Sequence, residues 1–430
     1  MKGKWPESYL SNPNPDKKIE EIWQDLDNYS FEELYSTPKM LHQMRVVVPL
    51  PPLLYKNHFV KGFCYTQTPD LIIDKLPDVQ KLFHVCANSM TFSYPWSQKA
   101  DCYFTCYENK KRERYFKKKN PHLKNISYLP LQDADYTNER VMKPVCDLPK
   151  VIDVLCLATP FPVKNLPVFA KALKIYEQKY GYRLKVIWGL GETTITKRPD
   201  GSIDYSQTID YAKKPLQEVD EILDNNIKAY IDFIPYINYW QLPKYFSLSK
   251  CAVLCSLYEG KNRFIHEAMS SNVPVVVFKD FNKFTRAKTP VFFGNGGEYA
   301  KSFTPEALAD AIHKILINPQ AYAPRENYLK YSGRANFMKN VIASMPYYQN
   351  NIPDLKEGNL FINKWVNQAM QAKYNMNYEN FLYEGNPAIS HVVGVENTFK
   401  LFKYYYQKFY LPWKNISLDD LQKEDKIKFK

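Results

Sequence analysis

Glycine is scarce in this sequence, and the scarcity excludes repetitive architectures. The 430 residues contain 14 glycines against 34 tyrosines and 25 phenylalanines, so a collagen-like repeat is ruled out. Apolar residues make up 45% and charged residues 24%, which excludes a disordered chain and a coiled coil. At roughly 100–200 residues per domain, the length indicates two domains, or three. We expect aromatic side chains to dominate the core.

Long hydrophobic runs are also missing. No apolar segment follows the lysines at the N-terminus, as a signal peptide would require. The longest apolar runs, such as residues 251–257, fall far short of the roughly 18 residues that a membrane span needs. We therefore expect a cytoplasmic protein.

Cysteine is present but not in a metal-binding pattern. Cys102 and Cys106 lie four residues apart, as do Cys251 and Cys255, and each pair falls in a strand-like run. Residues four apart on a strand share one face, so we expect both pairs to be buried as small apolar groups. No histidine flanks them at zinc-ligand spacing, and we expect no metal site.

Acidic residues are too few to balance the basic ones. The formal net charge is +13, which favours an anionic partner. Two segments combine lysines or arginines with aromatic residues: 110–119 (KKRERYFKKK) and 398–415 (TFKLFKYYYQKFYLPWKN). Such segments suit contact with an anionic membrane surface. A solvated helix face for the first, and a terminal helix packed back across the domains for the second, remain the alternatives.

Short apolar runs separated by polar stretches predict a parallel sheet in the first part of the chain. The runs expected to be strands are residues 45–50, 70–74, 82–87, 101–106 and 126–131. Residues 135–150 then have the composition of a linker, with two prolines.

A second block alternates more clearly between strand and helix. Strands are expected at 151–159, 183–191, 229–236, 252–260 and 273–278, and helical segments at 166–182, 239–249, 264–272 and 304–318. The first helix should end near Gly181, and Thr304 can cap the last. This alternation predicts a doubly wound parallel sheet whose ligand lies at the carboxyl ends of the strands.

The fold class predicted for the whole chain is α/β, with two doubly wound Rossmann-like domains facing a cleft. The first domain is expected at 1–148 and the second at 149–340. Residues 341–430 are expected to form a helical extension that packs back on the first domain.

Two carboxylates flank one turn at the end of a predicted strand. Glu259 follows the strand, Gly260 comes next, and Glu267 lies eight residues after Glu259 inside the following helix. Carboxylates accept hydrogen bonds from adjacent hydroxyls, as a sugar or a ribose presents them. Gly260 lets backbone N–H groups approach a ligand at the start of that helix, where the dipole favours an anion.

With its surroundings, this segment resembles the E-x7-E signature of retaining, nucleotide-sugar-dependent glycosyltransferases of the GT-B fold, closest to family 4. VLCLATPFPVKNLPVF resembles the family's opening strand and lysine loop, VIWGLGE its glycine turn, and NVPVVVF and PEALADAIHKIL the segments after the signature. The resemblance covers about residues 151–320 strongly and 80–135 weakly. An isolated E-x7-E would be far less specific than these features in order.

The resemblance implies a role for each matching residue. Glu259 would contact the hydroxyls of the donor sugar, Glu267 the ribose, and Lys164 the diphosphate. The remaining donor-binding residues would be Gly260, Lys261 and Asn262 through backbone groups, Arg263, and the turn residues Gly189 and Gly191. The resemblance implies no metal and no cofactor, because fixed cations and helix N-termini can stabilise the leaving phosphate.

The sequence also departs from the family pattern. Thr159 and Ala158 stand where the family usually has an arginine, so Arg263 or Lys261 would have to supply that charge. Residues 1–150 contain only two glycines, so the family's glycine-rich loop after the first strand is absent. On the acceptor side, Asn88 and His84 are the candidates for the family's strand-end histidine, and a packed histidine is the alternative for the latter.

We therefore expect a retaining, metal-independent glycosyltransferase that moves a hexose or related sugar to a glycan or lipid-linked acceptor in cell-surface polysaccharide synthesis. It would be cytoplasmic or peripheral on the inner face of the membrane. A nucleotide-sugar-binding protein without turnover, a basic nucleic-acid-binding protein and a GT-B sugar-nucleotide epimerase are the alternatives. No nucleic-acid-binding module is recognised in the sequence, so a nucleic-acid partner is not expected.

Overall fold

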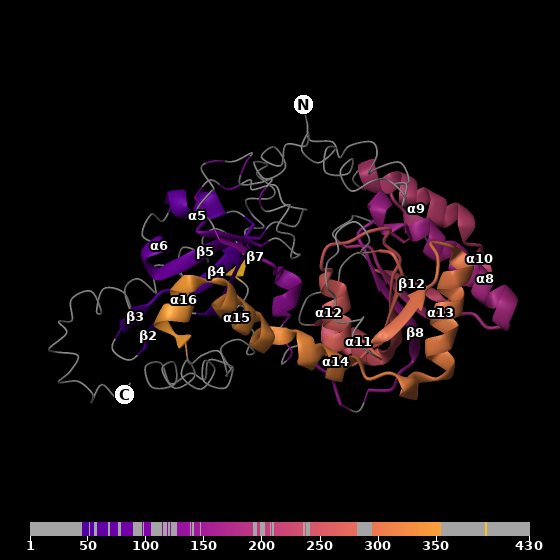
Figure 1. Cartoon of the computed structure of the whole chain (residues 1–430). Helices are drawn as coiled ribbons and strands as arrows, with labels where there is room; N and C mark the ends of the chain where they lie inside the picture. Colours follow the sequence, from indigo (N-terminus) through magenta and orange to yellow (C-terminus); the bar gives the residue numbers. More distant parts are fainter. Residues whose placement is uncertain are drawn as a thin grey trace. The chain divides into compact units, whose positions relative to one another are not determined.

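The computed structural model describes residues 45–353 with internal gaps, and residues 392–393. The gaps longer than three residues are 89–96, 105–113, 122–126, 192–195, 198–202 and 282–294. Within these ranges the chain forms two compact units, with boundaries between Tyr136 and Thr137 and between Gly333 and Arg334. Unit 1 therefore combines residues before 137 with residues after 333, and unit 2 holds the contiguous stretch between them (Figure 1).

Unit 2 contains a six-stranded parallel sheet in the order β12-β9-β8-β13-β14-β15. Its strands are β8 (Ile152–Leu157), β9 (Val186–Gly189), β12 (Ile231–Ile234), β13 (Ser249–Leu254), β14 (Val275–Phe278) and β15 (Gly297–Ala300). A separate two-stranded ribbon pairs β10 (Thr196–Lys197) with β11 (Ile203–Asp204). Numbered along the chain, the sheet order is 3-2-1-4-5-6, the doubly wound Rossmann arrangement that the sequence predicted.

Helices cover both faces of this sheet (Figure 1). On one side lie α8 (Leu166–Tyr180), α9 (Asp210–Ile222), α10 (Asn225–Lys228) and α13 (Pro305–Ile317); on the other lie α11 (Leu242–Leu248), α12 (Arg263–Ser270) and α14 (Pro324–Tyr331). Short 3-10 turns occupy η3 (Pro162–Lys164) and η6 (Pro319–Ala321). As predicted, Gly181 ends α8 in a left-handed conformation and the Thr304 hydroxyl caps α13 by accepting from the Ala307 amide.

Unit 1 has a six-stranded sheet of mixed direction, in the order β16-β1-β4-β5-β6-β7. Its strands are β1 (Arg45–Leu50), β4 (Gly62–Thr66), β5 (Phe83–Ala87), β6 (Cys102–Phe104), β7 (Ser127–Leu129) and β16 (Val392–Val393). A hairpin joins β2 (Leu53–Tyr55) to β3 (His58–Val60). Strands β4 to β7 are parallel, whereas β1 runs antiparallel to β4 and β16, so the prediction of a parallel strand at 45–50 was wrong in direction.

The strand predicted at residues 70–74 was also wrong. These residues belong to α5 (Pro69–Lys75), which is followed by α6 (Val79–Leu82), while the neighbouring strand β4 was missed. Three consecutive apolar residues, Leu71 to Ile73, have no period that separates a strand from a buried helical turn. Here Pro69 at the first helical position and Asp70 in the first turn favour the helix, which buries Ile72 and Ile73.

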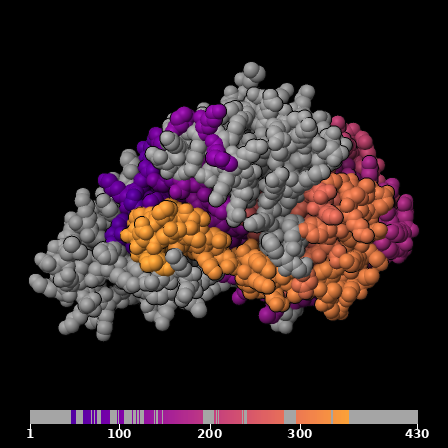
Figure 2. Space-filling view, viewed as in Figure 1, coloured from indigo at the N-terminus to yellow at the C-terminus, as the bar shows by residue number. Residues whose placement is uncertain are grey.

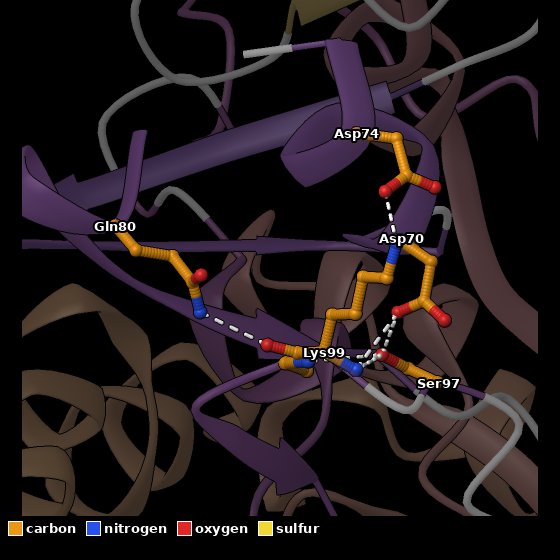
Figure 3. Close-up of polar contacts among 6 residues, drawn as sticks. Asp70, Asp74, Gln80, Ser97 and Lys99 are labelled. Atoms are coloured by element: carbon orange, nitrogen blue, oxygen red, sulfur yellow. Dashed lines mark hydrogen bonds and ion pairs between the residues drawn. The ribbon is translucent and has the colours of Figure 1, made fainter. Parts of the chain in front are cut away.

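A polar network fastens the segment before β6 to these two helices (Figure 3). The Asp70 carboxylate accepts from the Ser97 hydroxyl and the Lys99 amide, and the Lys99 ammonium pairs with Asp74. Gln80 on α6 donates to the Lys99 carbonyl (2.9 Å) and to the Asp101 carboxylate (3.1 Å). Side chains therefore hold Ser97 and Lys99 against α5 and α6.

The helices after residue 333 complete the core of unit 1. They are α15 (Gly333–Ser344) and α16 (Pro346–Asn351), preceded in the chain by the 3-10 turn η2 (Asp133–Tyr136) that closes the first part of the unit. Phe337 packs against Phe63 and Phe104, and the Tyr348 hydroxyl donates to the Gly62 carbonyl (2.8 Å). Figure 2 shows the yellow-orange atoms of this segment directly beside the indigo atoms of the first strands.

The two boundaries lie before the predicted positions of 148 and 340. Residues 137–142 belong to unit 2 because the Tyr328 hydroxyl donates to the Thr137 carbonyl and Met142 is fully buried in the core of that unit. In the described part of the chain, no helix is both long and apolar enough to span a membrane.

The start of β15 leaves no room for a side chain at Gly297. A Cβ there would overlap the backbone of its strand partner Val275, whereas a Cβ at Gly181 would meet no atom within 4 Å. We predict that Gly297→Ala lowers the free energy of unfolding of unit 2 by about 3 kcal/mol, because overpacking here must move backbone. Gly181→Ala serves as the control and should cost about 1 kcal/mol, since its φ of 67° strains an alanine.

Denaturant unfolding followed by hydrogen exchange of peptides from β14 and β15 measures both variants. A cost of Gly297→Ala no larger than that of Gly181→Ala would contradict the close strand packing.

Candidate donor-binding site

The candidate residues gather at the carboxyl edge of the unit 2 sheet. After β8 the chain turns through η3 into α8 on one face, and after the adjacent β13 it turns into α12 on the other face. Loops that diverge from two neighbouring strands leave a crevice between them, which is where doubly wound sheets bind ligands. Lys164 lies in the loop after β8 and Glu259 in the loop after β13.

Hydrogen bonds join these two loops. The Leu257 amide donates to the Val163 carbonyl (2.9 Å), and the buried Cys255 thiol donates to the Lys164 carbonyl (3.0 Å). Asn165 then takes a left-handed conformation with φ of 54°, and α8 begins at the next residue. The backbone of Lys164 is thus held from both sides.

The side chains of Lys164 and Glu259 form an ion pair across the crevice. Their side chains are 18% and 13% exposed, so the pair is largely withdrawn from water yet reachable from it. The buried Ser256 hydroxyl donates to the same carboxylate oxygen, Oε1, at 2.6 Å. The Glu259 amide donates to the Phe281 carbonyl (3.1 Å), which fixes the loop on its other side. The carboxylate is oriented, and its second oxygen, Oε2, takes no part in the contacts with Lys164 and Ser256.

Helix α12 begins at the end of the same loop. The Asn262 side chain caps it by accepting from the Phe264 amide (2.9 Å). Arg263, the first helical residue, pairs with Glu267 one turn later, with 2.9 Å between Nη2 and Oε1. The Glu267 side chain is 7% exposed, and His266 beside it is buried with its ring 6.1 Å from that of Tyr328. A buried carboxylate therefore lies within the first two turns of α12.

A glycine turn closes the end of the neighbouring strand β9. The Ala158 amide donates to the Gly189 carbonyl (2.9 Å), which keeps the two strand ends level. Gly191 has φ of 71°, and a Cβ there would come within 2.5 Å of the Thr159 hydroxyl oxygen. A side chain at position 191 would therefore collide with Thr159, so the close packing of this turn against Thr159 requires glycine.

Comparisons with known proteins show what the segment around this site is similar to. Residues 148–336 match the family model of glycosyl transferases group 1. This segment is less than half of the chain and contains both Lys164 and Glu259.

Solved structures are similar to the chain at low identity. A sucrose-phosphate synthase from Thermosynechococcus elongatus is 15% identical, with a TM-score of 0.42, over 64% of this chain and 71% of that chain. The C-terminal domain of a glycosyl transferase group 1 family protein from Francisella tularensis is 17% identical, with a TM-score of 0.34, over 45% and 96%. Anabaena HepE in complex with UDP-glucose is 13% identical, with a TM-score of 0.44, over 65% and 78%. A search of curated proteins gave no match.

Unit 2 brings together most of the residues that the sequence predicted for the donor side. Lys164 and Glu259 are in contact, Gly260 to Asn262 link them to α12, and Arg263 contacts Glu267. Gly189 and Gly191 lie at the end of β9, one strand away from Lys164 in the sheet order. The segment that matches the family model overlaps almost entirely with unit 2.

Sequence reasoning missed two residues that hold this site. Ser256 was not singled out, although a hydroxyl three residues before a loop carboxylate can hydrogen-bond to it, as Ser256 does. Cys255 was predicted only as a buried small residue, which it is, and its bond to the Lys164 carbonyl has no signal in the sequence.

The two acceptor-side candidates lie in unit 1, at different ends of β5. His84 is near the start of the strand, half-buried, with its ring centroid 4.4 Å from that of Tyr347 and 5.5 Å from that of Tyr348. Asn88 follows the carboxyl end of the strand and is 3% exposed. Its backbone N–H donates to the Thr66 carbonyl (2.8 Å). The surroundings of His84 are thus those of a packed aromatic residue.

Burial and the nearby Lys61 ammonium lower the pKa of His84 to about 4. The unfolded chain has an ordinary histidine pKa of about 6.5, so between these values the unfolded state binds the extra proton and stability falls as pH falls. We predict that lowering the pH from 7 to 5 costs unit 1 about 2 kcal/mol through this histidine. His84→Phe keeps the ring contacts with Tyr347 and Tyr348, and its stability should no longer show this dependence on pH.

Urea-dependent hydrogen exchange of peptides from β5 measures the loss in unit 1 for both proteins. Equal pH dependence of wild type and His84→Phe would show that His84 is not buried in its neutral form.

Proposed function

We propose that this protein transfers a sugar from a nucleoside diphosphate donor, with retention of anomeric configuration, at the carboxyl edge of the unit 2 sheet. The contact between Lys164 and Glu259 at the switch point of the sheet is the observation that carries the proposal. Glu267, eight residues after Glu259, supplies a second carboxylate to the same edge.

Each charged group in this arrangement suits one part of such a donor. An ammonium has three N–H donors, so Lys164 can hold Glu259 and still donate to a diphosphate oxygen. Oε2 of Glu259 can accept from hydroxyls of the sugar, and Glu267 can accept from the ribose. The N-terminus of α12, with the backbone of Gly260 to Asn262 leading into it, favours the negative diphosphate.

Bond cleavage in such a donor places negative charge on the leaving diphosphate and leaves an oxocarbenium-like sugar. Lys164 and the α12 N-terminus stabilise that leaving group, so we propose that no metal ion is required. The acceptor hydroxyl attacks from the side of the leaving group, which explains retention without a protein nucleophile. The leaving phosphate oxygen can accept the proton of the hydroxyl.

The acceptor we propose is a glycan or a lipid-linked glycan of a cell-surface polysaccharide, reached from the cytoplasmic side of a membrane. Support comes from the sequence: the basic-aromatic segments 110–119 and 398–415 suit an anionic membrane surface. Both segments lie outside the described residues except for Arg114 and Lys118, which are exposed. Co-sedimentation with anionic liposomes at low salt tests the proposed membrane contact. Failure of the protein to sediment with the liposomes would contradict it.

Two isosteric substitutions test the donor site. A thermal-shift panel of UDP-, GDP- and ADP-sugars first selects the donor, because a ligand that binds only the folded state raises the melting temperature. We predict that Glu267→Gln weakens donor binding about tenfold by removing a charged acceptor. Glu259→Gln should lower the rate of sugar transfer on the order of 100-fold while leaving a measurable shift with the nucleoside diphosphate.

The matched control is Glu218→Gln, which removes a half-exposed carboxylate from α9 of the same unit. It should leave affinity and rate unchanged. NMR of the product anomer distinguishes retention from inversion, and binding without transfer or hydrolysis would indicate the non-catalytic alternative. Wild-type affinity in Glu267→Gln would remove the ribose assignment.

A further inference from the structure

We propose that Arg263 is a diphosphate-binding residue that exchanges partners: it pairs with Glu267 in the structure and turns to the diphosphate when the nucleotide binds. This inference rests on the proposed function and deepens it, because it names the residue that supplies the second positive charge. It also gives Glu267 a second state, in which its carboxylate is free to accept ribose hydroxyls.

The place of Arg263 in α12 is unfavourable for helix stability. It is the first residue of the helix, where the positive end of the dipole disfavours a cation, and the first turn of α12 contains no acidic residue. Its pair with Glu267 runs from arginine to glutamate along the chain, which is the weaker order for residues four apart. The helix alone gives no reason for an arginine at this position.

Compensation of the buried Glu267 charge does not explain the position either. A carboxylate that is 7% exposed needs partners, either a cation or hydrogen-bond donors such as hydroxyls. That cation could equally come from position 271, one turn later, where the negative end of the helix would favour it, but this position holds Ser271. The sequence instead places the guanidinium at the end of the helix that faces the carboxyl edge of the sheet.

The basic residues at this edge outnumber the acidic ones by one, which favours the binding of an anion. Lys164, Lys261 and Arg263 carry three positive charges, and Glu259 and Glu267 carry two negative ones. In the structure Lys164 pairs with Glu259, and Arg263 with Glu267. Each carboxylate is thus paired with a cation that could also bind a phosphate.

A planar guanidinium binds phosphate oxygens in pairs, with charge-assisted hydrogen bonds. Arg263 is only four residues from Glu259, which limits the distance between their Cα atoms to about 14 Å. With 28% of its side chain exposed, the guanidinium is accessible to a ligand in the crevice. When it turns to the diphosphate, Oε1 of Glu267 loses this donor and can accept from a hydroxyl.

Calorimetric titration of the full-length protein tests the exchange by separating the diphosphate from the nucleoside. The probes are UDP, GDP and ADP with their nucleosides, and the pair carried forward is the one that binds wild type most tightly. We expect Arg263→Gln to weaken nucleoside diphosphate binding about 10- to 100-fold. Nucleoside binding should change less than threefold, since the nucleoside lacks the phosphates that Arg263 would bind.

Two further variants make the result specific. Arg263→Lys keeps the charge but not the paired donors, so its diphosphate affinity should fall between those of wild type and Arg263→Gln. Arg183→Gln is the matched control: it removes one arginine that is paired with Glu177 just before β9, at the amino edge of the same sheet. It should bind both probes as wild type does.

Three results would overturn the inference. Unchanged diphosphate affinity in Arg263→Gln would show that Arg263 does not contact the phosphates, and the proposed function would still stand. Equal loss of diphosphate and nucleoside would show that Arg263 only holds Glu267 in place. Absence of binding by all three diphosphates to wild type would instead remove the proposed function itself, and the inference with it.

Discussion

The contact between Lys164 and Glu259 depends on the order of strands in the unit 2 sheet. Because β8 and β13 are neighbours whose following helices lie on opposite faces, the loops after them diverge and then meet only through side chains and a few hydrogen bonds. An ion pair between Lys164 and Glu259 therefore joins the two loops at the carboxyl edge of the sheet. Any rearrangement of either loop changes the position of both charges at once.

Partial burial decides what this pair can do. A fully exposed pair would be screened by water and worth little, and a fully buried one would be costly to desolvate and closed to a ligand. The intermediate exposure of Lys164 and Glu259, with the Ser256 hydroxyl as an additional donor, keeps the carboxylate oriented and still accessible from solvent. Arg263 and Glu267 repeat this arrangement one helical turn further along the chain.

The sequence predicted unit 2 well because its central strands are short apolar runs bounded by turn residues and long helices. The strand at 152–157, the helix ending at Gly181 and the cap at Thr304 all follow from local chemistry. The site residues could be placed at the strand ends for the same reason. The pairing of Lys164 with Glu259 could not, because it depends on which strands are neighbours, and 95 residues separate the two.

Unit 1 was harder to predict because its core is assembled from distant parts of the chain. The hydroxyl of Tyr348 bonds to the carbonyl of Gly62, and that of Tyr347 accepts from the Lys61 amide, across 286 residues in each case. The sheet formed by residues 45–104 therefore has a complete core only with α15 and α16. The local sequence does not show these partners, so a buried helical turn and a buried strand have the same apolar pattern there. Unit 2 is contiguous and can bury its core from its own segment, whereas unit 1 can do so only after residue 352 has been synthesised. Unit 2 can thus bury its core while the last segments of unit 1 are still being synthesised, and the same chain order hides the pattern of unit 1 from local sequence reasoning.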